Sequence, residues 1–196
     1  MNKEYEHCEG FNSELNSNSN VLILGTLPPC ARDWYYKKDW MFWRIITKAT
    51  SSSIDLGHSS IEIKKQVLYN NRIALWDIMK SADRVNGSSR DSSLINKVPN
   101  DIAAELSKKN ANLSAIIING YRINEKKDSA FKWFKEYNHL IGEPKSDKDI
   151  DANSKYYIWN NIKVYPLQAT SAINQNRKNA TFDYEELWVK TLKRYI

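Results

Sequence analysis

Each apolar run along the central part of this 196-residue chain ends in side chains that can donate or accept hydrogen bonds. Together the run ends supply one acid, one amide and several hydroxyl groups. If the runs are parallel strands, their carboxyl ends meet at one edge of a sheet, where ligands bind in open α/β proteins. Loops are polar in general, so any single position could be polar without a function, whereas four together favour a site. The run ends are Gly25-Thr26-Leu27-Pro28, Trp76-Asp77, Asn119-Gly120 and Gln168-Ala169-Thr170-Ser171.

The loop after the first run adds aromatic and basic side chains beside these groups. Val21 to Leu24 form a continuous apolar run, typical of a strand that is buried on both faces of a parallel sheet. Pro28 and Pro29 follow, and because proline lacks an N–H donor and disfavours helical geometry in the preceding residue, we expect a rigid, extended loop. The aromatic and basic insert consists of Trp34, Tyr35, Tyr36, Lys37, Lys38, Asp39 and Trp40.

Strand-like and helix-like segments alternate along the chain, which predicts a three-layer αβα domain around a mainly parallel sheet. Residues 1–19 are polar and predict a poorly anchored lead-in, so we expect the single domain to span residues 20–196. Residues 79–99 show no sustained period and predict an irregular excursion. We expect strands near residues 21–24, 72–78, 113–118 and 156–166, and helices near 42–47, 59–69, 100–109, 122–137 and 183–195.

Local signals place some of the element ends. Asn100, directly after Pro99, is expected to cap the helix that follows. Asp183 and Glu186 have the spacing of a capping box and predict the start of the last helix. Asn160-Asn161 predicts the turn of a short antiparallel hairpin that enters the fourth strand.

Composition and charge limit the classes of function. A formal net charge of +6 and a pI of about 9.1 favour an anionic partner such as nucleic acid, although a charged, solvated surface is the commoner explanation. Two cysteines argue against a disulfide scaffold and are too few for a four-cysteine metal site. His7, His58 and His139 lack the spacing of metal ligands. Because phosphate-binding glycine loops and a nucleophile elbow are also missing, we expect no metal and no cofactor.

The hydropathy of the chain bears on its compartment. It contains no run of 18 apolar residues and no signal-like segment. We therefore expect a soluble, cytoplasmic protein that does not bind a membrane, and no protein partner is evident.

Several short motifs form a series along the chain. Gly25-Thr26-Leu27-Pro28 ends the first strand, Tyr35-Tyr36 lies in the loop, and Phe42-Trp43 opens a helix. The later motifs are Ile73–Asp77, Gly87-Ser88, Pro99-Asn100-Asp101, Ile118-Asn119-Gly120 and Ala169-Thr170-Ser171-Ala172. In this order the series resembles the uracil-DNA glycosylase superfamily, most closely its hypoxanthine-DNA glycosylase branch, over roughly residues 20 to 195.

The resemblance implies a four-stranded parallel sheet of order 2-1-3-4 and hydrolysis of the N-glycosidic bond to a deaminated base, of the uracil or hypoxanthine type. A duplex hides the glycosidic carbon, so the nucleotide must be flipped into a pocket and its base read along the hydrogen-bonding edge. Asp77 is expected to read that edge, as an acceptor when ionised and also as a donor when protonated. The expected base-binding residues are Gly25, Leu27, Pro28, Tyr36, Phe42, Asp77 and Asn119, with Tyr36 and Phe42 as the stacking wall and Thr26 and Asp39 as catalytic residues.

DNA is the expected partner, contacted by two loops. Ile173 could wedge into the gap left by the flipped base or could be a buried anchor of its loop. Lys37 and Lys38 could clamp a phosphate or form a solvated corner, and their position between aromatic residues favours the clamp. The expected DNA-binding residues are Lys37, Lys38, Thr170, Ser171, Ile173, Asn174, Arg177 and Lys178.

Two departures from the family pattern leave alternatives open. The branch has an asparagine, thought to carry catalysis, where this chain has Lys37–Met41, and Asp39 is the only residue there able to orient or deprotonate a water. It could equally be a surface carboxylate paired with a lysine. The last motif also lacks a histidine that helps the leaving base in other members, which leaves Thr170 and Ser171 as neutral donors. The hypotheses are therefore a monofunctional, metal-independent glycosylase, a binder that keeps the base pocket without cutting, and a hydrolase of free nucleosides or nucleotides.

Overall fold

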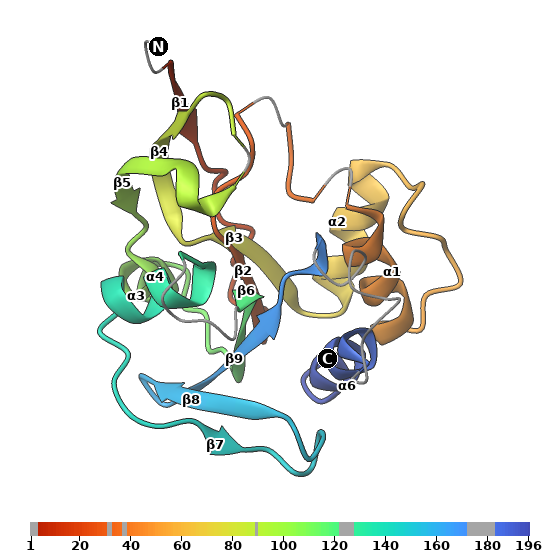
Figure 1. Ribbon diagram of the computed structural model, residues 1–196. Coiled ribbons are helices and arrows are strands. Elements are labelled where there is room, and N and C mark those ends of the chain that lie inside the picture. The colour runs from red at the N-terminus through yellow and green to blue at the C-terminus, as the bar shows by residue number, and fades with distance from the viewer. Residues whose placement is uncertain (1–3, 31–32, 37–38, 89, 122–127, 172–182) are drawn as a thin grey trace.

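A mixed six-stranded sheet forms the centre of the computed structural model (Figure 1). In spatial order its strands are β3 (Ile73–Asp77), β2 (Val21–Gly25), β6 (Ala115–Tyr121), β9 (Ile162–Gln168), β8 (Lys155–Trp159) and β7 (Lys145–Ser146). The first four are parallel to one another, whereas β8 and β7 extend one edge as antiparallel strands. The predicted α/β class is confirmed, but the sheet has two strands more than the predicted four. The structure describes residues 4–30, 33–36, 39–88, 90–121, 128–171 and 183–196.

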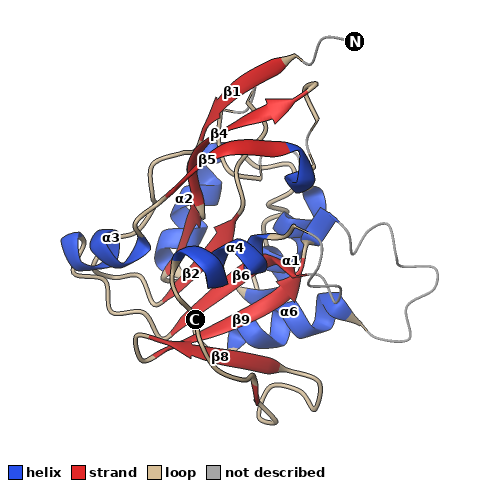
Figure 2. Ribbon diagram, turned by 60° about the vertical axis from the view of Figure 1, so that its left-hand side comes forward, coloured by secondary structure: helices blue, strands red, loops and turns tan. Residues whose placement is uncertain are grey.

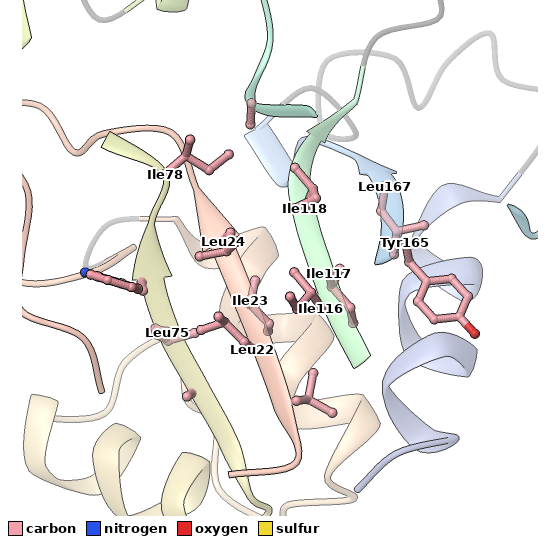
Figure 3. Packing of buried hydrophobic residues seen from close by; sticks show 14 of the residues in the cluster. Leu22, Ile23, Leu24, Leu75, Ile78, Ile116, Ile117, Ile118, Tyr165 and Leu167 are labelled. Carbon is pink, nitrogen blue, oxygen red and sulfur yellow. The ribbon is translucent and has the colours of Figure 1, made fainter. Parts of the chain in front are cut away.

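The core lies around the parallel strands. Every residue of β2 is buried, and Leu22, Ile23 and Leu24 are fully inaccessible to solvent. Because successive side chains of a strand point to opposite faces, a run that is buried throughout must be covered on both faces. Figure 3 shows these three side chains beside those of Ile116, Ile117 and Ile118 in β6. Full burial of a side chain of this size stabilises the fold by about 1.5–3 kcal/mol, so the two strands anchor the domain.

Helices cover both faces of the sheet (Figures 1 and 2). On one side lie α1 (Trp40–Ala49), α2 (Ile61–Asn70) and α6 (Tyr184–Lys193). On the other side lie α3 (Ile102–Lys108) and α4 (Ala130–Tyr137). The chain leaves β2 toward β3 and then crosses back to β6, and right-handed crossovers in opposite directions put their helices on opposite faces. No helix among the described residues has both the length and the apolar character to cross a membrane.

Side-chain caps fix where several of these elements begin. Asp183 accepts a hydrogen bond from the Glu186 amide at 3.0 Å, so the predicted start of the last helix is confirmed. The prediction for α3 is wrong by one residue, because Asp101 and not Asn100 caps the helix. The expected hairpin turn at Asn160-Asn161 joins β8 to β9, and both residues have the positive φ of a type I′ turn, 47° and 64°.

A second, antiparallel sheet packs beside the first and was not predicted. It has the order β1-β4-β5, with β1 (Tyr5–Glu9), β4 (Met79–Val85) and β5 (Leu94–Pro99). The expected lead-in thus contains the strand Tyr5–Glu9, and the segment expected to be irregular contains the strands Met79–Val85 and Leu94–Pro99. The alternation of side chains is hidden in the sequence because β1 buries only Cys8, and because β4 contains two register irregularities and buries the polar residue Arg84.

A disulfide joins the small sheet to the loop that follows β2. It joins Cys8 of β1 to Cys30, which lies in the loop that follows β2. Both cysteines of the chain are used in this bond. The loop that carries the first run end is therefore held covalently to the small sheet.

Candidate functional site

Three neighbouring strand ends bring an acid, a glycine and an amide side by side. In the pairing of β2 with β3, Gly25 lies opposite Asp77. In the pairing of β2 with β6, Leu24 lies opposite Ile118, so Asn119 follows on the other flank of Gly25. The predicted convergence at the carboxyl edge of the parallel strands is therefore present for Asp77, Gly25 and Asn119.

Gly25 is required by the close approach of two polar atoms. A Cβ atom added at this position would lie 2.8 Å from Asp77 Oδ1 and 2.8 Å from the hydroxyl oxygen of Tyr36. Contacts this short are essentially never tolerated, and any side chain at position 25 would push both groups away. The bare backbone at the middle strand end thus lets a carboxyl group and a phenol hydroxyl lie over it together.

Asp77 is a buried acid. Its side chain is 4% exposed, and Oδ2 has no hydrogen-bond partner among the residues that the structure describes. Burial raises the pKa of this carboxyl from its ordinary value of 3.8 to about 7, and a hydrogen bond from the Phe11 backbone only partly opposes that rise. Near neutral pH the group can therefore exist as a neutral acid, which both donates and accepts hydrogen bonds.

A hydrogen-bonded network joins Asp39, Thr170 and Asn119, which come from three distant parts of the chain. The Thr170 hydroxyl donates to Asp39 Oδ2 at 2.7 Å. The Thr170 amide donates to Asn119 Oδ1 at 2.9 Å, and Asn119 Nδ2 donates to the Thr170 hydroxyl oxygen at 3.4 Å. Asp39 also caps α1, because its Oδ1 accepts from the Phe42 amide at 3.1 Å. Asp39 is therefore bonded into this network at the strand ends, whereas Lys37 and Lys38, its partners in the alternative interpretation, lie outside the described residues.

Thr170 has a role different from the one predicted. The sequence suggested a DNA contact or a donor to the leaving base, but the side chain is only 1% exposed. Both of its donors, the hydroxyl and the amide, are directed to Asp39 and Asn119. Thr170 thus positions two other side chains and has no free surface for a phosphate, whereas its neighbour Ser171 is exposed.

The aromatic wall is built in two layers. Tyr36 stacks on Phe42 with ring centroids 3.9 Å apart and planes at 15°. Phe42 is fully buried and Tyr36 is half-buried, so Tyr36 is the ring that faces outward. The backbone of Tyr36 has a positive φ of 48°, and its carbonyl accepts hydrogen bonds from the Asp39 amide at 2.9 Å and from Trp43 Nε1 at 2.8 Å. Two bonds to one carbonyl hold this strained conformation in place.

The loop of residues 26–28 is held by two side chains that the sequence did not single out. Arg84 is 2% exposed, and its Nη2 donates to the carbonyl oxygen of Leu27 at 2.9 Å and to that of Pro28 at 3.5 Å. The Thr26 hydroxyl donates to Asp91 Oδ2 at 3.2 Å. Arginine is seldom buried, so nothing in the local pattern marked Arg84, although the Gly87-Ser88 motif lies close by. The expected catalytic residue Thr26 therefore faces Asp91, and the side chain of Leu27 packs in the core.

Six of the residues expected to contact DNA lie outside the described residues, namely Lys37, Lys38, Ile173, Asn174, Arg177 and Lys178.

One cluster of potential metal ligands occurs in the described part of the chain. Glu6, Cys8 and Cys30 bring ligand atoms within 4.8 Å of one another. Their two sulfur atoms are joined in the disulfide and are not thiolate ligands.

Comparisons with known proteins identify relatives of this chain. No family model matches the sequence. Over 120 residues the chain is 32% identical to a Methanosarcina acetivorans protein named hypoxanthine DNA glycosylase, a match that covers 59% of this chain and 73% of the relative. A Methanosarcina barkeri protein of the same name is 26% identical over 121 residues, which cover 60% of this chain and 73% of that protein. A solution NMR structure from Methanosarcina acetivorans, provisionally named a uracil DNA glycosylase, has a TM-score of 0.65 and 23% identity over 96% of this chain and 98% of that one, which supports the fold.

Proposed function

Because the chain belongs to the uracil-DNA glycosylase superfamily, in its hypoxanthine-DNA glycosylase branch, we propose that it is a DNA glycosylase. It hydrolyses the N-glycosidic bond of a deaminated base, of the uracil or hypoxanthine type, after that base is flipped out of DNA. The observation that carries this proposal is Asp77, a buried carboxyl at the strand ends whose Oδ2 has no hydrogen-bond partner among the described residues. The reaction needs neither a metal nor a second catalytic activity.

Base recognition follows from the protonation of Asp77. Deamination leaves a ring N–H beside a carbonyl oxygen in both uracil and hypoxanthine. A neutral carboxyl matches this pair, since its O–H donates to the carbonyl and its other oxygen accepts from the N–H. The same hydrogen bond stabilises negative charge on the departing base, which is the task that a histidine performs in other members of the superfamily. The raised pKa of Asp77 makes this neutral form available near pH 7.

Asp39 is the residue that assists bond cleavage at the sugar. Positive charge develops on the sugar as the glycosidic bond breaks, and a nearby carboxylate stabilises such charge. Among the described residues, each Asp39 oxygen accepts one hydrogen bond, from the Phe42 amide or from the Thr170 hydroxyl, and a carboxylate oxygen can accept a second one from a water. Thr170 and Asn119 fix the carboxylate so that an attacking water is oriented toward the sugar.

The flipped base stacks on Tyr36 in this proposal. Tyr36 already covers Phe42, so Phe42 supports the wall from behind and would contact a base only if Tyr36 moved away. The Tyr36 hydroxyl and Asp77 Oδ1 approach the same point over Gly25, which places the stacking ring beside the residue that reads the base.

A second function is a protein that binds a flipped base in DNA without cutting. It is favoured by the state of Asp39, because both carboxylate oxygens already accept hydrogen bonds from the protein. A carboxylate used only to cap α1 and to hold Thr170 would not activate water. In that case the base site would remain while hydrolysis was lost.

A base-release assay separates these functions. The protein is incubated with duplexes that hold one uracil, hypoxanthine or xanthine, and alkali then cleaves any abasic site. We expect strand breaks that disappear in Asp39→Asn. The matched control is Asp101→Asn, because Asp101 caps α3 through the Ala104 amide at 2.9 Å and lies outside the proposed site.

Three other outcomes would change the conclusion. Breaks that persist in Asp39→Asn would move catalysis to another residue. Tighter binding of lesion DNA than of normal DNA, without product from any lesion, would establish the binder. Turnover of free nucleosides or nucleotides without any polymer would establish the third hypothesis.

A further inference from the structure

Trp40 differs from every other tryptophan in the chain. All seven tryptophans lie in the described residues, and six of them are no more than 7% exposed. Trp40 is 46% exposed. Exposing a large part of an indole forgoes part of the free energy of burying it, and it leaves Trp40 with more surface for a ligand than the other tryptophans have.

Trp40 lies at the edge of the proposed active site. It is the first residue of α1 and directly follows Asp39, whose carboxylate meets Thr170 from the end of β9. An atom of DNA that reached Asp39 would therefore come close to the backbone of Trp40. Trp40 is thus the exposed aromatic residue next in the chain to a side chain that the proposed reaction brings against the nucleotide.

Cations accompany the exposed ring. The guanidinium of Arg44, one turn further along α1, lies 5.7 Å from the centroid of the Trp40 ring. Arg44 Nε and Lys48 Nζ both bond to Glu185 Oε1, at 3.0 and 2.5 Å. One acid thus serves two cations, and the Glu185 side chain is 8% exposed against 36% for Arg44 and 48% for Lys48. The more exposed charges in this group are therefore the two cations, while the carboxylate of Asp39, the residue before Trp40, accepts hydrogen bonds from the Phe42 amide and the Thr170 hydroxyl.

An exposed aromatic ring beside solvent-facing cations is the combination that binds nucleic-acid strands. Bases stack on such rings whatever their identity, while the cations attract the phosphate backbone. We propose that Trp40 is a stacking platform for the nucleotide next to the flipped one, in the strand that carries the lesion. This inference rests on the proposed function and adds a DNA contact that acts through stacking.

Binding of short DNA tests the platform. The probe is a fluorescein-labelled duplex with one tetrahydrofuran residue as an uncleavable abasic site, and fluorescence anisotropy gives Kd at several salt concentrations. Since one base stacked on an aromatic ring contributes about 1–3 kcal/mol, we expect Trp40→Ala to raise Kd by about 5- to 150-fold. The slope of log Kd against log salt should stay unchanged, because no phosphate contact is removed. Trp40→Phe, which keeps a ring, should restore most of the affinity.

Two further variants serve as controls. Tyr69→Ala removes another exposed aromatic, 55% exposed in α2, from the segment that leads into the opposite end of β3. It should leave Kd unchanged. Arg44→Gln should lower the salt slope by about one, and Lys48 still pairs with Glu185 in that variant.

The outcomes separate this inference from the proposed function. If the wild type binds lesion DNA and releases base but Trp40→Ala matches Tyr69→Ala within twofold in Kd, the platform is wrong and the proposed function stands. The exposed ring of Trp40 would then be assigned to contact with a protein partner instead of DNA. If the wild type neither binds the probe nor releases base, the proposed function fails and the platform falls with it.

Discussion

The protonation of Asp77 predicts two independent observations, one in the pH dependence of activity and one in the pH dependence of stability. In the proposed reaction the neutral acid reads the base, and the pKa of the folded protein is about 7. For a deaminated base, kcat/KM should therefore be level in the range just below pH 7, where Asp39 is still a carboxylate, and fall about tenfold for each pH unit above it. Asp77→Asn should keep much of the activity and lose this pH dependence, because an amide donates and accepts like a neutral acid but does not titrate in this range.

The free energy of unfolding should also depend on the protonation of Asp77. Between pH 3.8 and about 7 the unfolded chain holds an ionised Asp77 while the folded chain still binds the proton. The free energy of unfolding therefore falls as pH rises through this window, by roughly 4 kcal/mol at 1.36 kcal/mol for each pKa unit. Asp77→Asn removes this loss, so the variant should be more stable than the wild type above pH 7 and approach it near pH 3.8.

The assay compares urea unfolding of the two proteins across this pH range, together with base release at each pH. Asp147→Asn is a matched control with the opposite sign. Burial opposes ionisation of Asp147, but hydrogen bonds from the Tyr165 hydroxyl and the Lys163 ammonium lower its pKa, so this variant should be less stable than the wild type at neutral pH. A pH-independent kcat/KM in the wild type, or an Asp77→Asn variant that is inactive at every pH while folded, would refute the reasoning.

Three further predictions follow from single contacts. Cys30→Ser, or a reductant, should lower the free energy of unfolding by about 3 kcal/mol in chemical denaturation, because the disulfide closes a loop between cysteines 22 positions apart. Thr170→Val should lower kcat by about 10- to 100-fold with little change in DNA affinity, since a hydrogen bond to a charged group such as Asp39 contributes about 1.5–3 kcal/mol. Gly25→Ala should lower the free energy of unfolding by about 1–3 kcal/mol and slow base release, because the alanine methyl group would overlap Asp77 Oδ1 and the Tyr36 hydroxyl.

The sequence was sufficient where local pattern and fold agree. A continuous apolar run such as Val21 to Leu24 can only be buried on both faces, and in the structure it forms a central strand. Parallel strands expose their carboxyl ends at one edge, so the sequence predicts Asp77 and Asn119 beside Gly25, and the strand pairing confirms it. Asp39 was singled out as the one residue of its insert able to act on water, and the structure brings it to Thr170.

The parts that could not be predicted depend on long-range pairing. β1 shows no apolar alternation because it buries only Cys8, and its existence depends on β4, more than 70 positions away in the sequence. β4 is itself irregular in register, so its period is broken. The burial of Arg84 depends on the carbonyls of the loop after β2, and the direction of the Thr170 hydroxyl depends on the cap of α1. Neither is encoded in the residues next to it.

The most direct test of the central claim is detection of the released base itself. A duplex with a single hypoxanthine or uracil is incubated with the protein, and mass spectrometry measures the free base while alkaline cleavage counts abasic sites. We expect equal amounts of free base and abasic sites, lost in Asp39→Asn and retained in Asp101→Asn. The absence of free base from every lesion tested, from a protein that still binds lesion DNA more tightly than undamaged DNA, would contradict the account.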